Sequence, residues 1–181
     1  MRFNNREEIK EILQKDISNK EKRNLIANLK NYKTDLYRVI SVDEELDIKV
    51  GQIWDNLGRA TSWTDRNAEI RNMGFSPELK REVEYVLSVE GIEGYKVQYL
   101  QFDYLLDLLS EEMEQEEAEE LAEELSEDEV YLELMDLLGA DADMVDEAEV
   151  LVPAETKMEI VEIMDCREDE GYIEVVLREV K

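Results

Sequence analysis

One block of sixty residues, 97–156, contains no lysine or arginine and twenty-two aspartates and glutamates. Disordered acidic tails lack aliphatic residues, whereas leucine recurs throughout this block. An acidic stretch that also carries regularly spaced leucines predicts amphipathic helices with one strongly negative face. We therefore expect most of the chain to be folded.

The charge of the chain is polarised along its length. Residues 1–100 carry 17 basic and 18 acidic side chains, while residues 101–181 carry 4 and 30, which gives net charges of -1 and -26. A surface of this kind repels nucleic acids and anionic membranes, and it attracts a partner with a basic groove. The composition therefore favours a protein that binds a positively charged partner.

The acidic helices are expected at 103–125 and 126–139. Residues 103–125 are dominated by leucine, glutamate and alanine, and Ser126 to Glu129 form a capping-box pattern that ends before Gly139. A continuous helix over 103–125 would span roughly 35 Å and carry about one carboxylate per 3 Å. A strand of duplex DNA carries one phosphate about every 3.4 Å. The predicted charge density thus approaches that of a nucleic-acid strand.

The first half is predicted to form short helices. Apolar residues recur at helical spacing in 9–17, 25–32 and 36–40, and again in 46–57 before Gly58. The sequence Ser76-Pro77-Glu78 is typical of a helix start, with buried residues following at 83–87.

The last forty residues change in character. Residues 149–152, 158–165 and 172–180 are rich in valine and isoleucine, and the polar run 167–171 predicts a hairpin loop. The predicted fold class is α+β, with a mainly helical N-terminal and central part and a small C-terminal antiparallel sheet. We expect a helical domain at 1–94, and an acidic helical segment with a C-terminal hairpin at 95–181.

Most catalytic arrangements are excluded because the chain has no histidine and no glycine-rich phosphate loop. Counted from Asp141, the acidic run 141–147 would begin a calcium loop with Asp146 at the sixth position and Val152 at the twelfth, where such a loop requires a glycine and a glutamate. We therefore expect no enzyme activity, no catalytic residue, no cofactor and no metal site. No run of apolar residues is long enough to cross a membrane, and the expected location is the cytoplasm of a bacterial host cell.

Residues 50–71 resemble a helix-turn-helix motif, with a glycine at the turn and arginines in the second predicted helix. Arg59, Arg66 and Arg71 would contact DNA phosphates if the motif forms. The match is partial, because Trp54 and Thr64 occupy positions where such motifs carry small and apolar residues. Three ordinary helices with surface arginines remain the alternative interpretation.

The histidine-free, acid-only run 111–120 resembles anti-CRISPR proteins and DNA-mimic antirestriction proteins of phages and mobile elements. This resemblance implies a non-enzymatic inhibitor that occupies the basic nucleic-acid channel of a nuclease, and the nuclease that we expect is a Cas9-type CRISPR effector. The partner-binding residues predicted from the acidic helices are Asp107, Glu111, Glu112, Glu114, Glu116, Glu117, Glu119, Glu120, Glu123, Glu124, Glu127 and Asp128.

Two other functions stay open at this point. One is a helix-turn-helix transcriptional regulator in which the first half binds DNA and the acidic part recruits protein. The other is a structural or adaptor protein that assembles through its acidic helices. A homodimer formed through the apolar stripe of Leu105, Leu109 and Met113 is compatible with all three functions.

Overall fold

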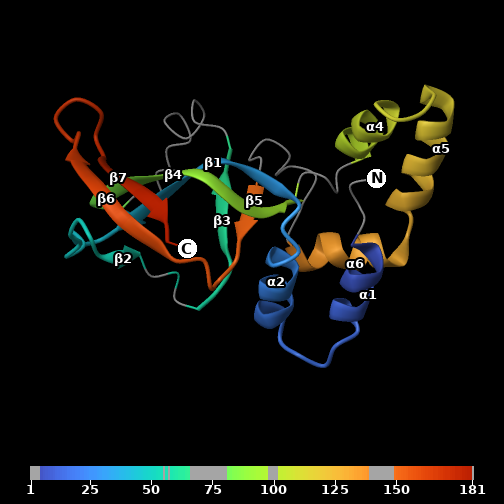
Figure 1. Cartoon of the computed structure of the whole chain (residues 1–181), viewed down its shortest axis with the longest axis horizontal. Coiled ribbons are helices and arrows are strands. Elements are labelled where there is room, and N and C mark those ends of the chain that lie inside the picture. The colour runs from blue at the N-terminus through green and yellow to red at the C-terminus, as the bar shows by residue number, and fades with distance from the viewer. Residues whose placement is uncertain are drawn as a thin grey trace.

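The computed structural model describes residues 5–54, 56, 58–65, 81–97, 102–138 and 149–180. The helices gather at one end of the molecule and the strands at the other (Figure 1). The helices are α1 (Arg6–Leu13), α2 (Asn19–Ala27), α4 (Phe102–Ser110), α5 (Gln115–Ser126) and α6 (Glu129–Leu138). The strands are β1 (Tyr32–Val42), β2 (Ile53–Trp54), β3 (Thr61–Thr64), β4 (Val83–Lys96), β5 (Glu149–Val152), β6 (Met158–Asp165) and β7 (Ile173–Glu179).

A seven-stranded sheet organises the fold, in the order β1-β3-β5-β4-β7-β6-β2. An additional pairing between β1 and β4 joins the first and fourth strands of this order, so that β1, β3, β5 and β4 form a closed ring. Among the strands that the structure describes, all pairings are antiparallel except that of β4 with β7. Closure of a sheet onto itself removes unpaired edges. The sheet takes strands from both predicted domains, and the division at residues 94 and 95 stays a prediction.

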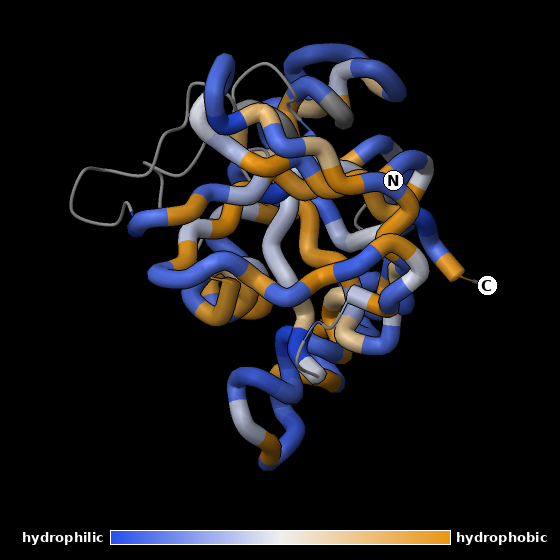
Figure 2. The backbone as a smooth tube through the Cα atoms, turned by 90° about the vertical axis from the view of Figure 1, so that its left-hand side faces the viewer, coloured by the Kyte–Doolittle hydropathy of each residue, from blue (hydrophilic) through white to orange (hydrophobic). Residues whose placement is uncertain are grey.

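The main core lies between the strands. Leu36, Leu87 and Val175 are completely buried there, because alternate residues of a strand point to the same face. The long β1–β4 ladder, from Tyr32 opposite Gly94 to Val42 opposite Val83, is the largest pairing in the sheet. Hydrophobic residues are concentrated in the strands, while the outer turns are mostly hydrophilic (Figure 2).

Three helices form a second core against β4 and β5. Ile9 of α1, Ile26 of α2 and Leu134 of α6 are buried together with Tyr95 and Leu151 of the sheet. The start of α2 is fixed by a capping box, in which Ser18 accepts from the backbone N–H of Glu21 while the Glu21 carboxylate accepts from that of Ser18. The packing of the second core holds α2 against β4 and β5.

The acidic helices α4 and α5 form a hairpin at the edge of the molecule, away from β6 and β7 (Figure 1). The hairpin has a small core of its own, made by Leu105, Leu109, Ala118 and Ala122. The predicted continuous helix 103–125 is wrong, because α4 ends at Ser110 and α5 begins at Gln115. The break lets the two leucine faces pack on each other, and the carboxylates do not form one straight row.

The predicted fold class is wrong. Residues 36–40, expected in a helix, belong to β1, and residues 46–57, expected in another, contain β2. The helical spacing of their apolar residues is real, but β-branched residues such as Val39 and Ile40 also suit a strand, and pairing with β4 decides the outcome. Residues 83–87, predicted as helical, likewise belong to β4. Strands β5, β6 and β7 confirm the predicted C-terminal strands.

The helix-turn-helix prediction is also wrong, since β2 and β3 occupy the part of 50–71 that the structure describes. The helix start predicted at Ser76-Pro77-Glu78 lies outside the described residues. Within the described ranges, no helix is both long enough and apolar enough to cross a membrane.

Candidate functional site

Ser62 and Glu149 form the centre of the candidate site. Strand β3 pairs with β5 so that Ser62 lies opposite Leu151 and Thr64 lies opposite Glu149. Ser62 and Glu149 are therefore diagonal neighbours on one face of the ladder, while Thr61 and Trp63 point into the protein. The Ser62 hydroxyl donates a hydrogen bond to Oε1 of Glu149, with an O–O distance of 2.5 Å. This bond holds the carboxylate in one orientation.

Arg23 approaches the same carboxylate from α2. Its Nη2 lies 3.8 Å from Oε1 of Glu149. Its Nη1 donates to the carbonyl oxygens of Leu137 and Leu138, at 3.3 and 3.0 Å. These carbonyls are at the end of α6, where a cation compensates the negative end of the helix dipole. Arg23 therefore links α2, the end of α6 and the first residue of β5.

Two further guanidinium groups lie beside this pair, on Arg38 of β1 and on Arg59 before β3. Burial lowers the pKa of Arg38, and the positive charge of Arg59 lowers it further. In the part of the chain that the structure describes, neither guanidinium has a carboxylate within ion-pair distance. Two neighbouring cations that are not neutralised by the protein form a site for an anion.

Ser62 and the three arginines line a cavity of about 470 Å³, and Glu149 lies next to this lining through its contacts with Ser62 and Arg23. Helix α2 contributes three neighbours on one of its faces, Lys20, Arg23 and Asn24. Oδ1 of Asn24 accepts from the backbone N–H of Ala60 at 2.6 Å, which fixes the chain just before Thr61. The complete lining comprises Lys20, Arg23, Asn24, Arg38, Arg59, Ala60, Thr61 and Ser62.

The arrangement combines an anion site with an oriented carboxylate. Guanidinium groups bind phosphate oxygens through paired N–H donors. A fixed carboxylate can stabilise positive charge that develops on a sugar carbon when a glycosidic bond breaks. Among the described residues, no group of three or more aspartate, glutamate or cysteine side chains is placed to hold a metal ion. The cavity is thus suited to a phosphorylated glycoside.

The acidic residues predicted to bind a partner lie on or beside the α4–α5 hairpin. None of them lines the cavity. They are exposed, except for Asp128, which is half-buried and paired with Arg6. Whether they bind a basic partner stays a prediction, as does the homodimer. Of the three predicted DNA-contacting arginines, Arg59 lies in the cavity, while Arg66 and Arg71 lie outside the described residues.

The sequence patterns did not identify Arg38, Ser62 or Glu149 as site residues. Glu149 was correctly predicted to begin a strand, but nothing distinguished it among forty-eight acidic residues. Ser62 is separated from it by 87 positions, so their contact depends on the pairing of β3 with β5. The sequence feature that could have indicated the site is Arg38, a cation directly before the β-branched residues Val39 and Ile40 of β1.

No family model matches the chain, and no curated protein is significantly similar to it. The solved structures that it resembles include Vis toxin, an ADP-ribosyltransferase from Vibrio splendidus, with 16% identity and a TM-score of 0.47 over 98% of this chain and 68% of that one. They also include ADP-ribosyltransferase HopU1 of Pseudomonas syringae pv. tomato DC3000, with 13% identity and a TM-score of 0.40 over 82% and 45%. The type III effector XopAI from Xanthomonas axonopodis pv. citri has 12% identity and a TM-score of 0.40 over 83% and 45%.

The chain spans less than half the length of the XopAI and HopU1 chains. The solved structures that the chain resembles are ADP-ribosyltransferases and a type III effector, not anti-CRISPR or DNA-mimic proteins, and the predicted resemblance is corrected accordingly. The predicted non-enzymatic nuclease inhibitor is therefore wrong, as are the Cas9 target and the alternative of a transcriptional regulator. The strands β2 and β3 also disagree with the helix-turn-helix on which the predicted regulator depended.

Proposed function

We propose that the chain is an enzyme that transfers the ADP-ribosyl group of NAD to an acceptor. The observation that supports this most directly is the Ser62–Glu149 hydrogen bond, beside a cavity that Arg38 and Arg59 make cationic. NAD presents the two groups that this arrangement complements, a pyrophosphate and a ribose with a cationic leaving group. Vis toxin and HopU1 are named as ADP-ribosyltransferases, and the residues of this chain support the same activity.

Arg38 and Arg59 bind the pyrophosphate in this proposal, and Lys20 adds positive charge at the rim. Their role is to hold the donor in position, which removes much of the entropic part of the barrier. Bidentate contacts from arginine also fix the orientation of the phosphates. The nicotinamide ribose then lies over the Ser62–Glu149 pair.

The bond that breaks joins C1′ of this ribose to the ring nitrogen of nicotinamide. Its electron pair leaves with nicotinamide, which departs as a neutral molecule, and positive charge develops on the ribose. The carboxylate of Glu149 stabilises that charge. A nucleophile on the acceptor, or water, forms the new bond to C1′ and loses a proton. Ser62 positions Glu149 throughout.

The test is incubation of the full-length protein with NAD labelled on the adenosine part, with and without a bacterial or eukaryotic protein extract. We expect release of nicotinamide and appearance of the label on one or a few acceptor proteins. Free labelled ADP-ribose without an extract would indicate that water also serves as acceptor. Absence of nicotinamide release in every condition, from protein that binds ADP-ribose, would contradict the proposed transfer.

The basic partner predicted from the acidic hairpin stays a prediction, and so does the cytoplasmic location. An acceptor with a basic surface is the kind of partner that this prediction requires.

A further inference from the structure

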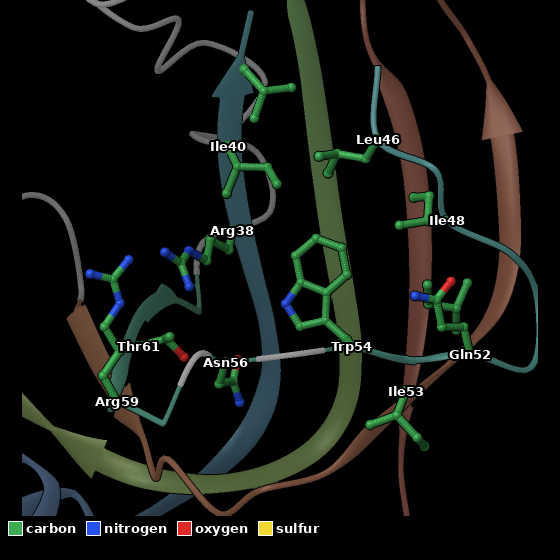
Figure 3. A pocket seen from close by; sticks show the side chains of 12 residues that line it. Arg38, Ile40, Leu46, Ile48, Gln52, Ile53, Trp54, Asn56, Arg59 and Thr61 are labelled. Carbon is green, nitrogen blue, oxygen red and sulfur yellow. The ribbon is translucent and has the colours of Figure 1, made fainter. Parts of the chain in front are cut away.

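A second cavity, of about 400 Å³, adjoins the first. Arg38, Arg59 and Thr61 line both cavities and therefore form the boundary between them. From this boundary the second cavity extends along the C-terminal half of β1, from Arg38 to Val42, towards β2 and β6 (Figure 3). It contains neither Ser62 nor any residue of β5. The proposed chemistry does not use it.

The walls of this cavity suit a flat aromatic ring. The half-buried indole of Trp54 lies between Arg38 and Ile40 of β1 on one side and Leu46 and Ile48 on the other (Figure 3). Indole rings stack on nucleobases, and this contact is among the stronger ones that proteins make with bases. Aliphatic side chains beside the indole exclude water from the stacked face.

Asn56 supplies a polar group at the same cavity. The residue is 5% exposed, and its Nδ2 donates to the carbonyl oxygen of Thr156 at 3.2 Å. Its Oδ1 is buried and has no hydrogen-bond partner among the described residues. A buried acceptor without a donor is unfavourable, and it indicates that a donor is supplied from elsewhere. An amino group on a ring stacked against Trp54 would be such a donor.

We propose that this second cavity binds the adenine ring of the donor, and this inference rests on the proposed function. If Arg38 and Arg59 hold the pyrophosphate, the two nucleosides extend to opposite sides of that pair. The reacting ribose occupies the side of Ser62 and Glu149. The adenosine therefore occupies the side of Trp54, where the ring stacks on the indole and its exocyclic amino group donates to Oδ1 of Asn56. The cavity thus selects an amino-bearing purine.

ADP and IDP test this selection, because IDP carries a carbonyl oxygen where ADP carries the amino group. We expect the wild-type protein to bind ADP on the order of tenfold more tightly than IDP in equilibrium titrations. Asn56→Ala should weaken ADP binding to the level of IDP and leave IDP binding nearly unchanged. Trp54→Ala should weaken both nucleotides by about tenfold or more, and Trp54→Phe should restore most of the loss.

Inorganic pyrophosphate serves as the control ligand, since it requires Arg38 and Arg59 but no base. Its affinity should be the same in the wild type and in both cavity variants, which also shows that the variants are folded. If a variant loses pyrophosphate binding, the gentler Asn56→Ser and Trp54→Phe replace it. Equal affinity for ADP and IDP in the wild type, or an unchanged preference in the Asn56 variant, would overturn the assignment.

The same data separate this inference from the proposed function. Selective ADP binding without nicotinamide release would retain the base site and reject the transferase. Nicotinamide release with a KM for NAD that Trp54→Ala leaves unchanged would retain the transferase and reject the base site.

Discussion

Arg23 of α2 brings its Nη2 to 3.8 Å from Oε1 of Glu149, while Nη1 of the same guanidinium donates to two carbonyls at the end of α6. The candidate carboxylate is thereby coupled to helices that belong to the second core. Ser62 of β3 holds the same carboxylate through the hydrogen bond from its hydroxyl. The orientation of Glu149 thus depends on both halves of the fold.

Replacement of Arg23 should affect both stability and turnover. Arg23→Met removes charged hydrogen bonds to Leu137 and Leu138, and we expect the free energy of unfolding in urea to fall by about 1–3 kcal/mol. The kcat for nicotinamide release should fall more than the KM for NAD rises, and Arg23→Lys should recover little because it cannot span both groups. Arg178→Met, which removes an exposed pair with Glu159, is the control and should change stability by less than about 1 kcal/mol. A loss of stability without a change in kcat would show that Arg23 is only structural.

The hydroxyl of Ser62 should matter through orientation of Glu149. Ser62→Ala leaves the carboxylate without this donor, and we expect kcat to fall by roughly 10- to 100-fold, with the dissociation constant for ADP-ribose nearly unchanged. Ser62→Thr retains a hydroxyl at the same position of β3 and should recover much of the rate. Equal defects in the two variants would argue against the hydrogen bond as the cause.

The two guanidiniums of the anion site should act on binding. Arg38→Met and Arg59→Met should each weaken ADP-ribose and pyrophosphate binding by about tenfold or more, because charged hydrogen bonds contribute about 1.5–3 kcal/mol. The positive charges of Arg38 and Arg59 repel each other, so removal of either charge should leave the protein at least as stable towards heat as the wild type. Methionine retains an aliphatic chain in place of the buried stem of Arg38. Titration calorimetry at two salt concentrations measures the first effect. Unchanged pyrophosphate affinity in both variants would show that Arg38 and Arg59 do not form an anion site.

A buried ion pair fastens the end of β3 to β4. Nζ of Lys96 lies 2.7 Å from Oδ2 of Asp65, with 6% and 13% of the two side chains exposed, and Tyr32 donates to the same oxygen at 2.9 Å. Lys96→Met leaves the Asp65 charge buried, and we expect a loss of about 3–5 kcal/mol in urea unfolding. The double variant with Asp65→Asn should lose less than the single variant, since it removes both charges. An additive double variant would contradict coupling between the two residues.

The parts of the fold that depend on local signals were predictable from the sequence. Strands β6 and β7 alternate apolar and polar residues around a polar loop, and the pattern at Ile9, Ile12 and Leu13 marks α1. Strand β1 was not predictable in this way, because the spacing of Leu36, Val39 and Ile40 fits a helix as well as a strand. Its state is decided by pairing with β4, a contact across about fifty residues that no local pattern encodes.

The candidate site was not predictable either, because its residues are distant in the sequence and meet only in the fold. The uneven charge distribution predicted a binding site at the carboxylates of the α4–α5 hairpin. The cavity is instead lined by cationic side chains of the nearly neutral first half of the chain. Only Arg59 was among the predicted contact residues, and it was assigned to DNA phosphates. Arg59 still binds phosphate in the proposed function, but the phosphate belongs to a dinucleotide and not to DNA.

The most direct test compares nicotinamide release by the wild type and by Glu149→Gln, each with its affinity for NAD measured in parallel. Glutamine retains the size of the side chain and can still contact Ser62, but it cannot offset positive charge on the ribose. We predict a loss of at least a hundredfold in kcat with NAD affinity changed less than about threefold. Glu155→Gln, an exposed carboxylate beyond the end of β5, should behave as the wild type. Undiminished nicotinamide release by Glu149→Gln would contradict the central claim.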